Sequence, residues 1–115
     1  MKFKILENRT FYIKEFKDGL TIGDIFFKFP WLLNAILYDA VLGKDKWGDL
    51  IWYDGVWVKG TWEYGKWRKG TWKNGTWKGG TWWDGTWENG IWKEGYIWNE
   101  KKKDYVYSTK PPKNK

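Results

Sequence analysis

Tryptophan recurs every five positions through the second half of the chain, and glycine recurs with the same period three positions later. Between residues 60 and 95 the unit reads Gly, usually Thr, Trp, and then two residues that are mostly polar. A period of five matches neither the 3.6 residues of a helical turn nor the two-residue alternation of a strand. Each unit must therefore combine a short extended segment with a turn. The repeated tryptophans are Trp47, Trp52, Trp57, Trp62, Trp67, Trp72, Trp77, Trp82, Trp87 and Trp92.

The dipeptides between the Trp-centred triads are typical of tight hairpin turns. Asn74-Gly75 and Asn89-Gly90 are favoured in type I′ turns, which need a positive φ at both central positions. Three-residue strands such as Thr71–Lys73 remain between the turns, and repeated hairpins would pair Trp72 with Trp77. We therefore predict a mainly β fold, a long and narrow antiparallel meander over residues 46–98. One face would carry a ladder of Trp52, Trp57, Trp62, Trp67, Trp72, Trp77, Trp82, Trp87 and Trp92.

A parallel solenoid with several pentapeptides in each coil is the alternative architecture for the same period. Classical pentapeptide-repeat proteins adopt it, and they place Leu or Phe inward with small residues beside it. An indole is larger than either side chain, which favours the meander.

The segment before the repeat, residues 1–45, is predicted to be a small α+β cap. Short strands are expected at 3–6 and 11–16, with a turn at 17–19, whereas residues 20–29 are compatible with a strand or a helical turn. An amphipathic helix is predicted over residues 30–42, packed on the Trp face. It would begin at Pro30, end before Gly43, and bury Leu33, Ile36, Leu37, Ala40 and Val41.

After Gly95 the register changes, because Ile97 takes the place of Trp and Trp98 comes one position late. We expect the sheet to end or to be capped there. Residues 99–115 carry a net charge of +4 out of +7 for the whole chain, and they are predicted to form a basic, flexible tail.

The composition argues against an enzyme. The 115 residues include 13 Trp and 14 Gly but no Cys and no His, which excludes disulfides, thiol nucleophiles, His-based triads and ordinary zinc sites. Carboxylates such as Asp54, Asp84 and Glu94 fall at turns, and no glycine-rich loop opens a helix. We expect no catalytic residue, no metal and no cofactor.

Targeting features are also absent from the sequence as given. The first residues lack the apolar region of a signal peptide, and the longest apolar run, near residues 29–42, is interrupted by Asn34 and Asp39. We expect no membrane insertion and a cytoplasmic location.

A basic cluster lies in the middle of the repeat, on the predicted face opposite the Trp ladder. In the meander Lys66 and Lys73 would be directly paired across strands, which favours an anion or an acidic partner between them. A solvated surface is the alternative interpretation. Candidate interaction residues on this face are Lys66, Arg68, Lys69, Lys73, Lys78 and Trp83.

The Trp ladder would be too long for one short helix to cover, because ten strands about 4.8 Å apart span roughly 45 Å. It would serve as a core, as a homodimer interface or as a partner surface, and we favour the homodimer over a monomer wrapped by its own N-terminal segment. Indoles beside Asn74, Asp84 or Asn89 would also suit a glycan, although these residue types are expected at the turns for conformational reasons alone.

The GTWKN-type units resemble the Trp/Gly pentapeptide repeats of bacterial and bacteriophage proteins and, more loosely, the MORN repeat. The resemblance covers residues 46–95 and implies a platform for protein or lipid contact. A bacteriophage setting would imply a viral, anti-defence protein in the host cytoplasm. The function we predict is a non-enzymatic protein-interaction module that inhibits a host or defence factor by surface occlusion; the alternative is a protein that binds glycans or nucleic acid.

Overall fold

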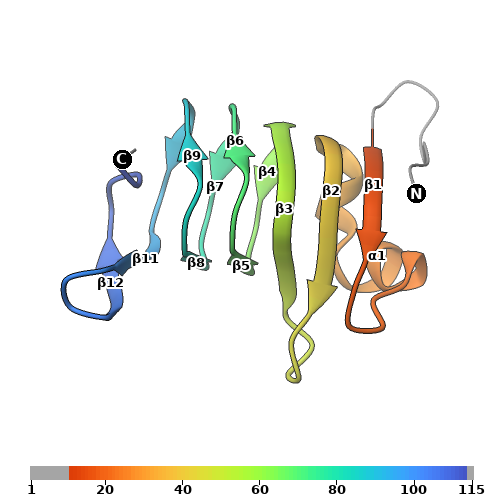
Figure 1. Ribbon diagram of the computed structural model, residues 1–115. Helices are drawn as coiled ribbons and strands as arrows, with labels where there is room; N and C mark the ends of the chain where they lie inside the picture. Colours follow the sequence, from red (N-terminus) through yellow and green to blue (C-terminus); the bar gives the residue numbers. More distant parts are fainter. Residues whose placement is uncertain (1–10, 114–115) are drawn as a thin grey trace.

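The repeat forms a β-solenoid in which three pentapeptides make one 15-residue coil. The computed structural model describes residues 11–113, and its strands pair in parallel with partners 15 positions away (Figure 1). Trp52 pairs with Trp67 and Trp67 with Trp82, for example. The repeat strands are β3 (Leu50–Lys59), β4 (Thr61–Trp62), β5 (Lys66–Trp67), β6 (Thr71–Trp72), β7 (Thr76–Trp77), β8 (Thr81–Trp82), β9 (Thr86–Trp87) and β10 (Ile91–Trp92).

The coils stack so that the solenoid has three sides. The first half of β3 is followed by β5 and β8 on the first side, and the second half of β3 by β6 and β9 on the second side. Strands β4, β7 and β10 form a separate sheet on the third side. Each side therefore repeats one pentapeptide in three, and residues 15 apart are neighbours.

The antiparallel meander predicted from the sequence is wrong, and the backbone at the corners explains why. A type I′ turn needs two consecutive residues with positive φ, but here only the glycine has one: Gly75 has φ 114°, whereas Asn74 before it is outside that region. A single positive φ turns the chain into the next side of the coil instead of reversing it. Trp72 consequently pairs with Trp57 and Trp87 and not with Trp77.

The tryptophans fill the interior of the solenoid. Along each side the indole rings are stacked almost parallel, with centroids 4.7 to 5.1 Å apart and interplanar angles of 4 to 6°. Successive rings around the coil, such as Trp57 and Trp62, meet edge to face at 5.7 Å. Three indoles per level thus occupy the triangular space, and the expectation that indole is too large for such an interior is wrong.

Glycine at the corners lets the coils approach each other closely. A Cβ atom added to Gly80 would lie 2.1 Å from the carbonyl oxygen of Gly65 in the coil below, and Gly80 has φ 110°. Neither the contact nor the backbone conformation tolerates a side chain. Gly79 has no such restriction, since its nearest contact would be 3.8 Å from Glu63 O.

The N-terminal segment closes one end of the solenoid. Strand β1 (Phe11–Phe16) pairs in parallel with β2 (Ile36–Lys44), which pairs in antiparallel fashion with β3. Between them lie helix α1 (Ile22–Lys28), which begins with a capping box, and the 3-10 helix η1 (Pro30–Asn34). The Trp31 ring meets Trp62 edge to face at 5.3 Å, so η1 covers the first coil.

The predicted helix over residues 30–42 is wrong beyond its first turn. Pro30 does begin a helical turn, but residues from Ile36 onward form β2, because Leu37 and Leu42 lie buried opposite Trp57 and Trp52 of the first coil. Strand pairing and burial against the first coil stabilise the extended conformation more than the helical spacing of the apolar residues stabilises a helix. The predicted strand at 11–16 and the turn at 17–19 are confirmed, and the predicted strand at 3–6 lies outside the described residues.

A hairpin ends the solenoid at its other extremity. Strand β11 (Gly95–Asn99) continues the first side by pairing with β8, which places Ile97 over Trp82. It then pairs in antiparallel fashion with β12 (Asp104–Ser108). The sheet therefore does not end after Gly95, the first of the two predicted alternatives, but is capped by this hairpin, and the tail predicted to be flexible contains β12.

The corner geometry predicts opposite effects for two adjacent glycines. Gly80→Ala should lower the free energy of unfolding by about 3 kcal/mol or more, because it combines backbone strain with a clash against Gly65. Gly79→Ala, the matched control, should be neutral or stabilising by about 0.5 kcal/mol. Urea unfolding followed by circular dichroism measures both, and equal stabilities would contradict the corner assignment.

The ladder predicts that the cost of losing an indole depends on its place in the stack. Trp72→Ala removes a fully buried ring that is stacked on both faces, and should destabilise the protein by about 3–5 kcal/mol. Trp47→Ala, at an exposed tryptophan outside the ladder, should change stability by less than about 0.5 kcal/mol. Chemical denaturation of the two variants would refute the ladder if their losses were similar.

Candidate interaction surface

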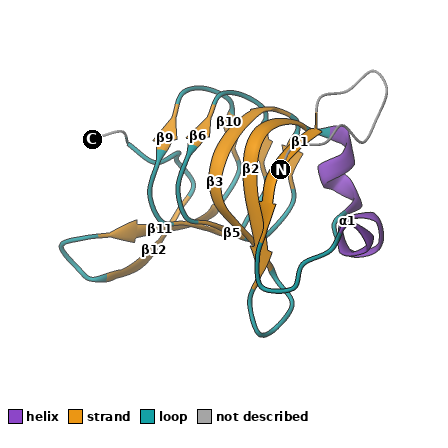
Figure 2. Cartoon of the chain, turned by 45° about the vertical axis from the view of Figure 1, so that its right-hand side comes forward, coloured by secondary structure: helices purple, strands orange, loops and turns teal. Residues whose placement is uncertain are grey.

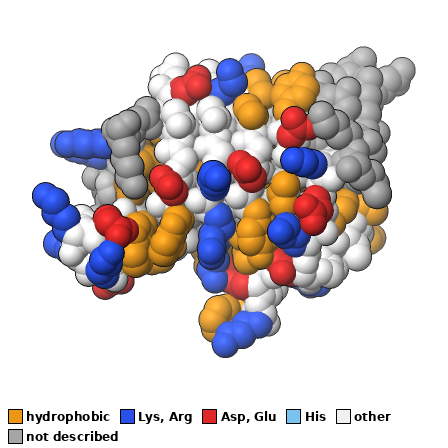
Figure 3. All heavy atoms as spheres, viewed as in Figure 1, with side chains coloured by type: hydrophobic (Ala, Val, Ile, Leu, Met, Phe, Trp, Pro, Cys, Tyr) orange, Lys and Arg blue, Asp and Glu red, His pale blue; other side chains and the backbone are white. Residues whose placement is uncertain are grey.

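The first side of the solenoid carries aromatic and basic side chains on its outer surface. Since the central residue of each strand points inward, the residues on both sides of it point outward. The two hairpin strands β11 and β12 extend this surface, and Figure 3 shows hydrophobic patches separated by basic side chains along the lower part of the molecule. We call this surface the aromatic face; its residues are Tyr53, Lys66, Arg68, Trp83, Tyr96, Trp98, Tyr105 and Tyr107.

Stacking contacts join the aromatic face into one row. Trp83 and Trp98 are stacked with centroids 4.1 Å apart, and Tyr105 meets both rings edge to face at 5.8 and 5.3 Å. The Arg68 guanidinium lies 5.7 Å from the Trp83 centroid. Because Arg68 is one coil before Trp83 and Trp98 one coil after it, both faces of the Trp83 indole are covered and its edge is directed outward.

Arg68 and Lys69 bring uncompensated positive charge to this surface. They line a shallow groove with Tyr53, Trp83 and Asp84. Within residues 11–113, neither cation has a carboxylate within ion-pair distance, and both side chains are exposed. Burial raises the pKa of the nearby Tyr105, so its phenol stays protonated at neutral pH.

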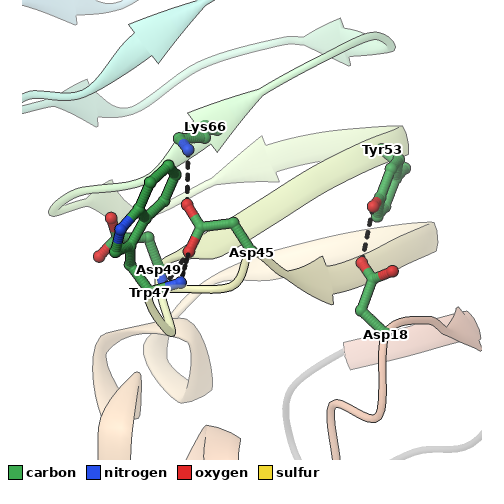
Figure 4. A network of polar contacts seen from close by, with 6 residues as sticks. All are labelled: Asp18, Asp45, Trp47, Asp49, Tyr53 and Lys66. Atoms are coloured by element: carbon green, nitrogen blue, oxygen red, sulfur yellow. Dashed lines mark hydrogen bonds and ion pairs between the residues drawn. The ribbon is translucent and has the colours of Figure 1, made fainter.

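A hydrogen-bonded loop between β2 and β3 displays Trp47 beside the aromatic face. The Asp45 carboxylate accepts hydrogen bonds from the backbone N–H groups of Trp47 and Asp49, both at 2.9 Å, and pairs with Lys66 at 2.5 Å (Figure 4). The Trp47 ring is 72% exposed and has the Lys66 ammonium 5.0 Å from its centroid. The loop thus presents an indole that no other described residue buries.

Hydrogen bonding sets the protonation of two groups in this network. Burial of the Asp45 carboxyl would raise its pKa, but hydrogen bonds from Lys66, Asp49 and Trp47 outweigh this effect and the pKa lies below its usual value. Tyr53 donates a 2.6 Å hydrogen bond to Asp18 from the turn after β1, which raises the pKa of Tyr53. At neutral pH Asp45 is ionised and Tyr53 is protonated.

The structure divides the basic cluster predicted from the sequence among the three sides. Lys66, Arg68 and Trp83 lie on the first side, with Lys69 at the following corner. Lys73 lies on the second side, where its N–H bonds to Trp57, and Lys78 lies on the third, 3.3 Å from Glu63. Lys66 and Lys73 are therefore not paired across strands, and the inference of an anion or an acidic partner between them loses its basis.

Other predicted candidates have structural roles. The Trp ladder is interior, so Trp rows facing each other across a dimer are not the arrangement found. Asn74 and Asp84 accept 2.8 Å hydrogen bonds from the N–H of the glycine that follows each of them, as a turn residue would. The sequence analysis did not include Trp98, Tyr105 and Trp47 among the candidate interaction residues. For Trp98 the reason is that its position over Trp83 follows only from the 15-residue length of the coil.

No helix among residues 11–113 combines the length and the apolar character needed to cross a membrane. The same residues contain no group of three or more carboxylates placed to hold a metal ion. Comparison with protein-family models, curated proteins and solved structures gives no significant match.

The Asp45 network predicts a specific response to acid. Lys66→Met should raise the Asp45 pKa above its wild-type value, because burial of the carboxyl remains while its hydrogen bond to Lys66 is lost. Lys69→Met, which also removes one charge, should leave it unchanged. Carboxyl carbon NMR during an acid titration reports this pKa directly.

The same pairing has a consequence for stability. A lowered pKa in the folded state means that the stabilisation is present above the unfolded pKa of about 3.9 and is lost as pH falls through the folded value. The stability difference between wild type and Lys66→Met should therefore shrink on acidification. A difference that grows towards low pH would contradict the pairing.

Proposed function

We propose that this protein is a non-enzymatic binding module that uses the aromatic face to bind, and thereby occlude, an acidic surface of a partner protein. The observation that carries the proposal is the composition of the face. Trp, Tyr and Arg dominate the energetics of protein interfaces, and the row formed by Tyr53, Arg68, Trp83, Trp98 and Tyr105 consists of these three types.

Preorganisation supports the same function. The face is built on strands whose interior is a stacked ladder, and its own rings are held by contacts such as Trp83 on Trp98. Side chains that are already fixed lose little conformational entropy on binding. The unpaired cations Arg68 and Lys69 favour a partner that supplies carboxylates, which also accelerates association.

Single-stranded nucleic acid and glycans, the alternative ligands, are bound through open aromatic ring faces. Both faces of the Trp83 indole are covered by Arg68 and Trp98, so this central ring of the row offers its edge for contact. A ring edge is better suited to contact with a flat protein surface than to stacking against a base or a sugar. This geometry favours the protein partner over both alternatives.

Charge-matched variants test the proposal. The double variant Arg68→Glu, Trp83→Thr should reduce capture of the partner from a lysate of the natural host cells at least 10-fold, because loss of a hot-spot side chain costs about 2 kcal/mol or more. The control Lys73→Glu, Ile91→Thr makes the same change in net charge at exposed residues of the other two sides and should retain capture. Quantitative mass spectrometry after cross-linking measures the ratio.

Two results would contradict the proposed function. Equal capture by wild type and by the Arg68→Glu, Trp83→Thr variant would remove the aromatic face from binding. Saturable binding of a labelled oligonucleotide, or of a glycan on an array, that is lost in the same variant would show that the aromatic face binds one of the alternative ligands. Unchanged circular dichroism spectra of both variants establish that the solenoid is intact.

A further inference from the structure

Strand β12 leaves one long edge of the sheet open. It is the last strand on the path that runs from β1 through β2, β3, β5, β8 and β11, and among the described strands it pairs only with β11. Figure 2 shows the hairpin of β11 and β12 projecting from the body of the solenoid. The side of β12 that faces away from β11 is therefore accessible to another chain.

The direction of the backbone groups follows from the bond that β11 makes with β8. Tyr96 donates its N–H to Gly80 O, away from β12, so Tyr96 and Tyr107 form a pair without hydrogen bonds between them. The N–H and C=O of Tyr107 consequently point outward from the open edge. Tyr105, two positions earlier, has the same orientation, but its N–H is held by Asp104 Oδ1 at 2.8 Å.

The open edge thus offers one donor and two acceptors in the spacing of a β-ladder. These are the N–H of Tyr107 and the carbonyls of Tyr105 and Tyr107, which point away from β11. Within residues 11–113, no other backbone group outside the strand pairs is hydrogen-bonded to them. An added strand could engage all three, as in recognition by β-augmentation.

Charge identifies the kind of strand that fits. Exposed lysines flank both ends of β12, with Lys101 and Lys102 in the hairpin loop and Lys110 and Lys113 after the strand. None of these four has an ion pair within the described part of the chain, whereas Lys103 is paired with Glu100. A second copy would bring the same positive charge, so an acidic segment is the complementary occupant.

A groove on the inner side of the hairpin adds an apolar subsite. It has a volume of about 330 Å³, and its lining includes Ile97, Val106, Pro111 and Pro112. Alternate side chains of an added strand point to opposite faces of the sheet. One set would lie beside Tyr105 and Tyr107, and the other beside this groove.

We propose that the outer edge of β12 binds an extended acidic peptide segment as an additional strand, with apolar side chains directed towards the groove at Ile97 and Val106. The inference rests on the proposed function and names its mode: the partner of the aromatic face contributes a strand whose carboxylates meet the lysines at both ends of β12. The aromatic face and the open edge are continuous, because Tyr105 belongs to both.

A synthetic peptide of alternating Glu and Val, seven residues long with Glu at both ends and blocked termini, is the probe. Added to the isotope-labelled full chain, it should shift the amide resonances of β12 in a saturable manner and slow hydrogen exchange at the Tyr107 amide at least 10-fold. The same peptide with N-methyl groups on alternate backbone nitrogens keeps its charge and loses its ladder donors, and should bind at least 10-fold more weakly.

Two substitutions at one position separate the backbone from the side chain. Tyr107→Pro removes the outward N–H and should abolish peptide binding, while Tyr107→Thr keeps that N–H in a β-favouring residue and should retain it. Unchanged amide resonances in the Trp ladder show that both variants fold. If the ring of Tyr107 were the binding element, both variants would lose the peptide equally.

Three outcomes would overturn strand addition. One is the absence of saturable shifts up to millimolar peptide, another is equal binding of the N-methylated peptide, and the third is protection of the Tyr107 amide that rises with protein concentration alone, which would assign the edge to a second copy. If the peptide does not bind but the Arg68→Glu, Trp83→Thr variant loses capture of the partner, strand addition at β12 is rejected and the proposed function of the aromatic face is retained.

Discussion

Face-to-face stacking of indole rings at the spacing of hydrogen-bonded strands is the interaction on which this fold depends. Parallel strands lie about 4.8 Å apart, and the stacked indoles lie 4.7 to 5.1 Å apart along each side. The two distances agree, so the backbone ladder and the aromatic ladder form together without strain. Because each coil closes after three pentapeptides, three such stacks run along one axis and meet edge to face.

Filling the interior with indoles leaves ring N–H groups unpaired and brings the rings close to the corner glycines. Within residues 11–113, five indole N–H groups are buried without a hydrogen-bond acceptor; they belong to Trp52, Trp57, Trp67, Trp72 and Trp77. The rings reach under the glycines of the following coil: a Cβ on Gly70 would lie 3.2 Å from Trp52 Nε1. The glycines therefore serve both the turn and the ring, which explains why the period is kept from Gly55 to Gly90.

The sequence was sufficient to predict the repeat unit and the corner positions, but not the pairing. Gly75 and Trp72 were each assigned to the correct place in the pentapeptide, because their spacing is visible along the chain. Whether Trp72 meets Trp77 or Trp87 depends on one φ angle at Asn74, which Asn tolerates in either region. The β2 strand was missed for a related reason: Leu37 and Leu42 read as a helical stripe until the first coil exists to bury them.

The candidate surface was harder to predict than the fold because it exists only in the 15-residue register. Arg68, Trp83 and Trp98 are 15 positions apart, so they form one row because each coil contains three pentapeptides. The five-residue period by itself does not show that they are neighbours. Inward positions are almost always Trp, whereas the outward residue that follows each central residue on the first side is Tyr53, Arg68, Trp83 or Trp98. The interior stack does not require aromatic or basic residues at these outward positions, and the binding role proposed above would account for the row of Arg68, Trp83 and Trp98.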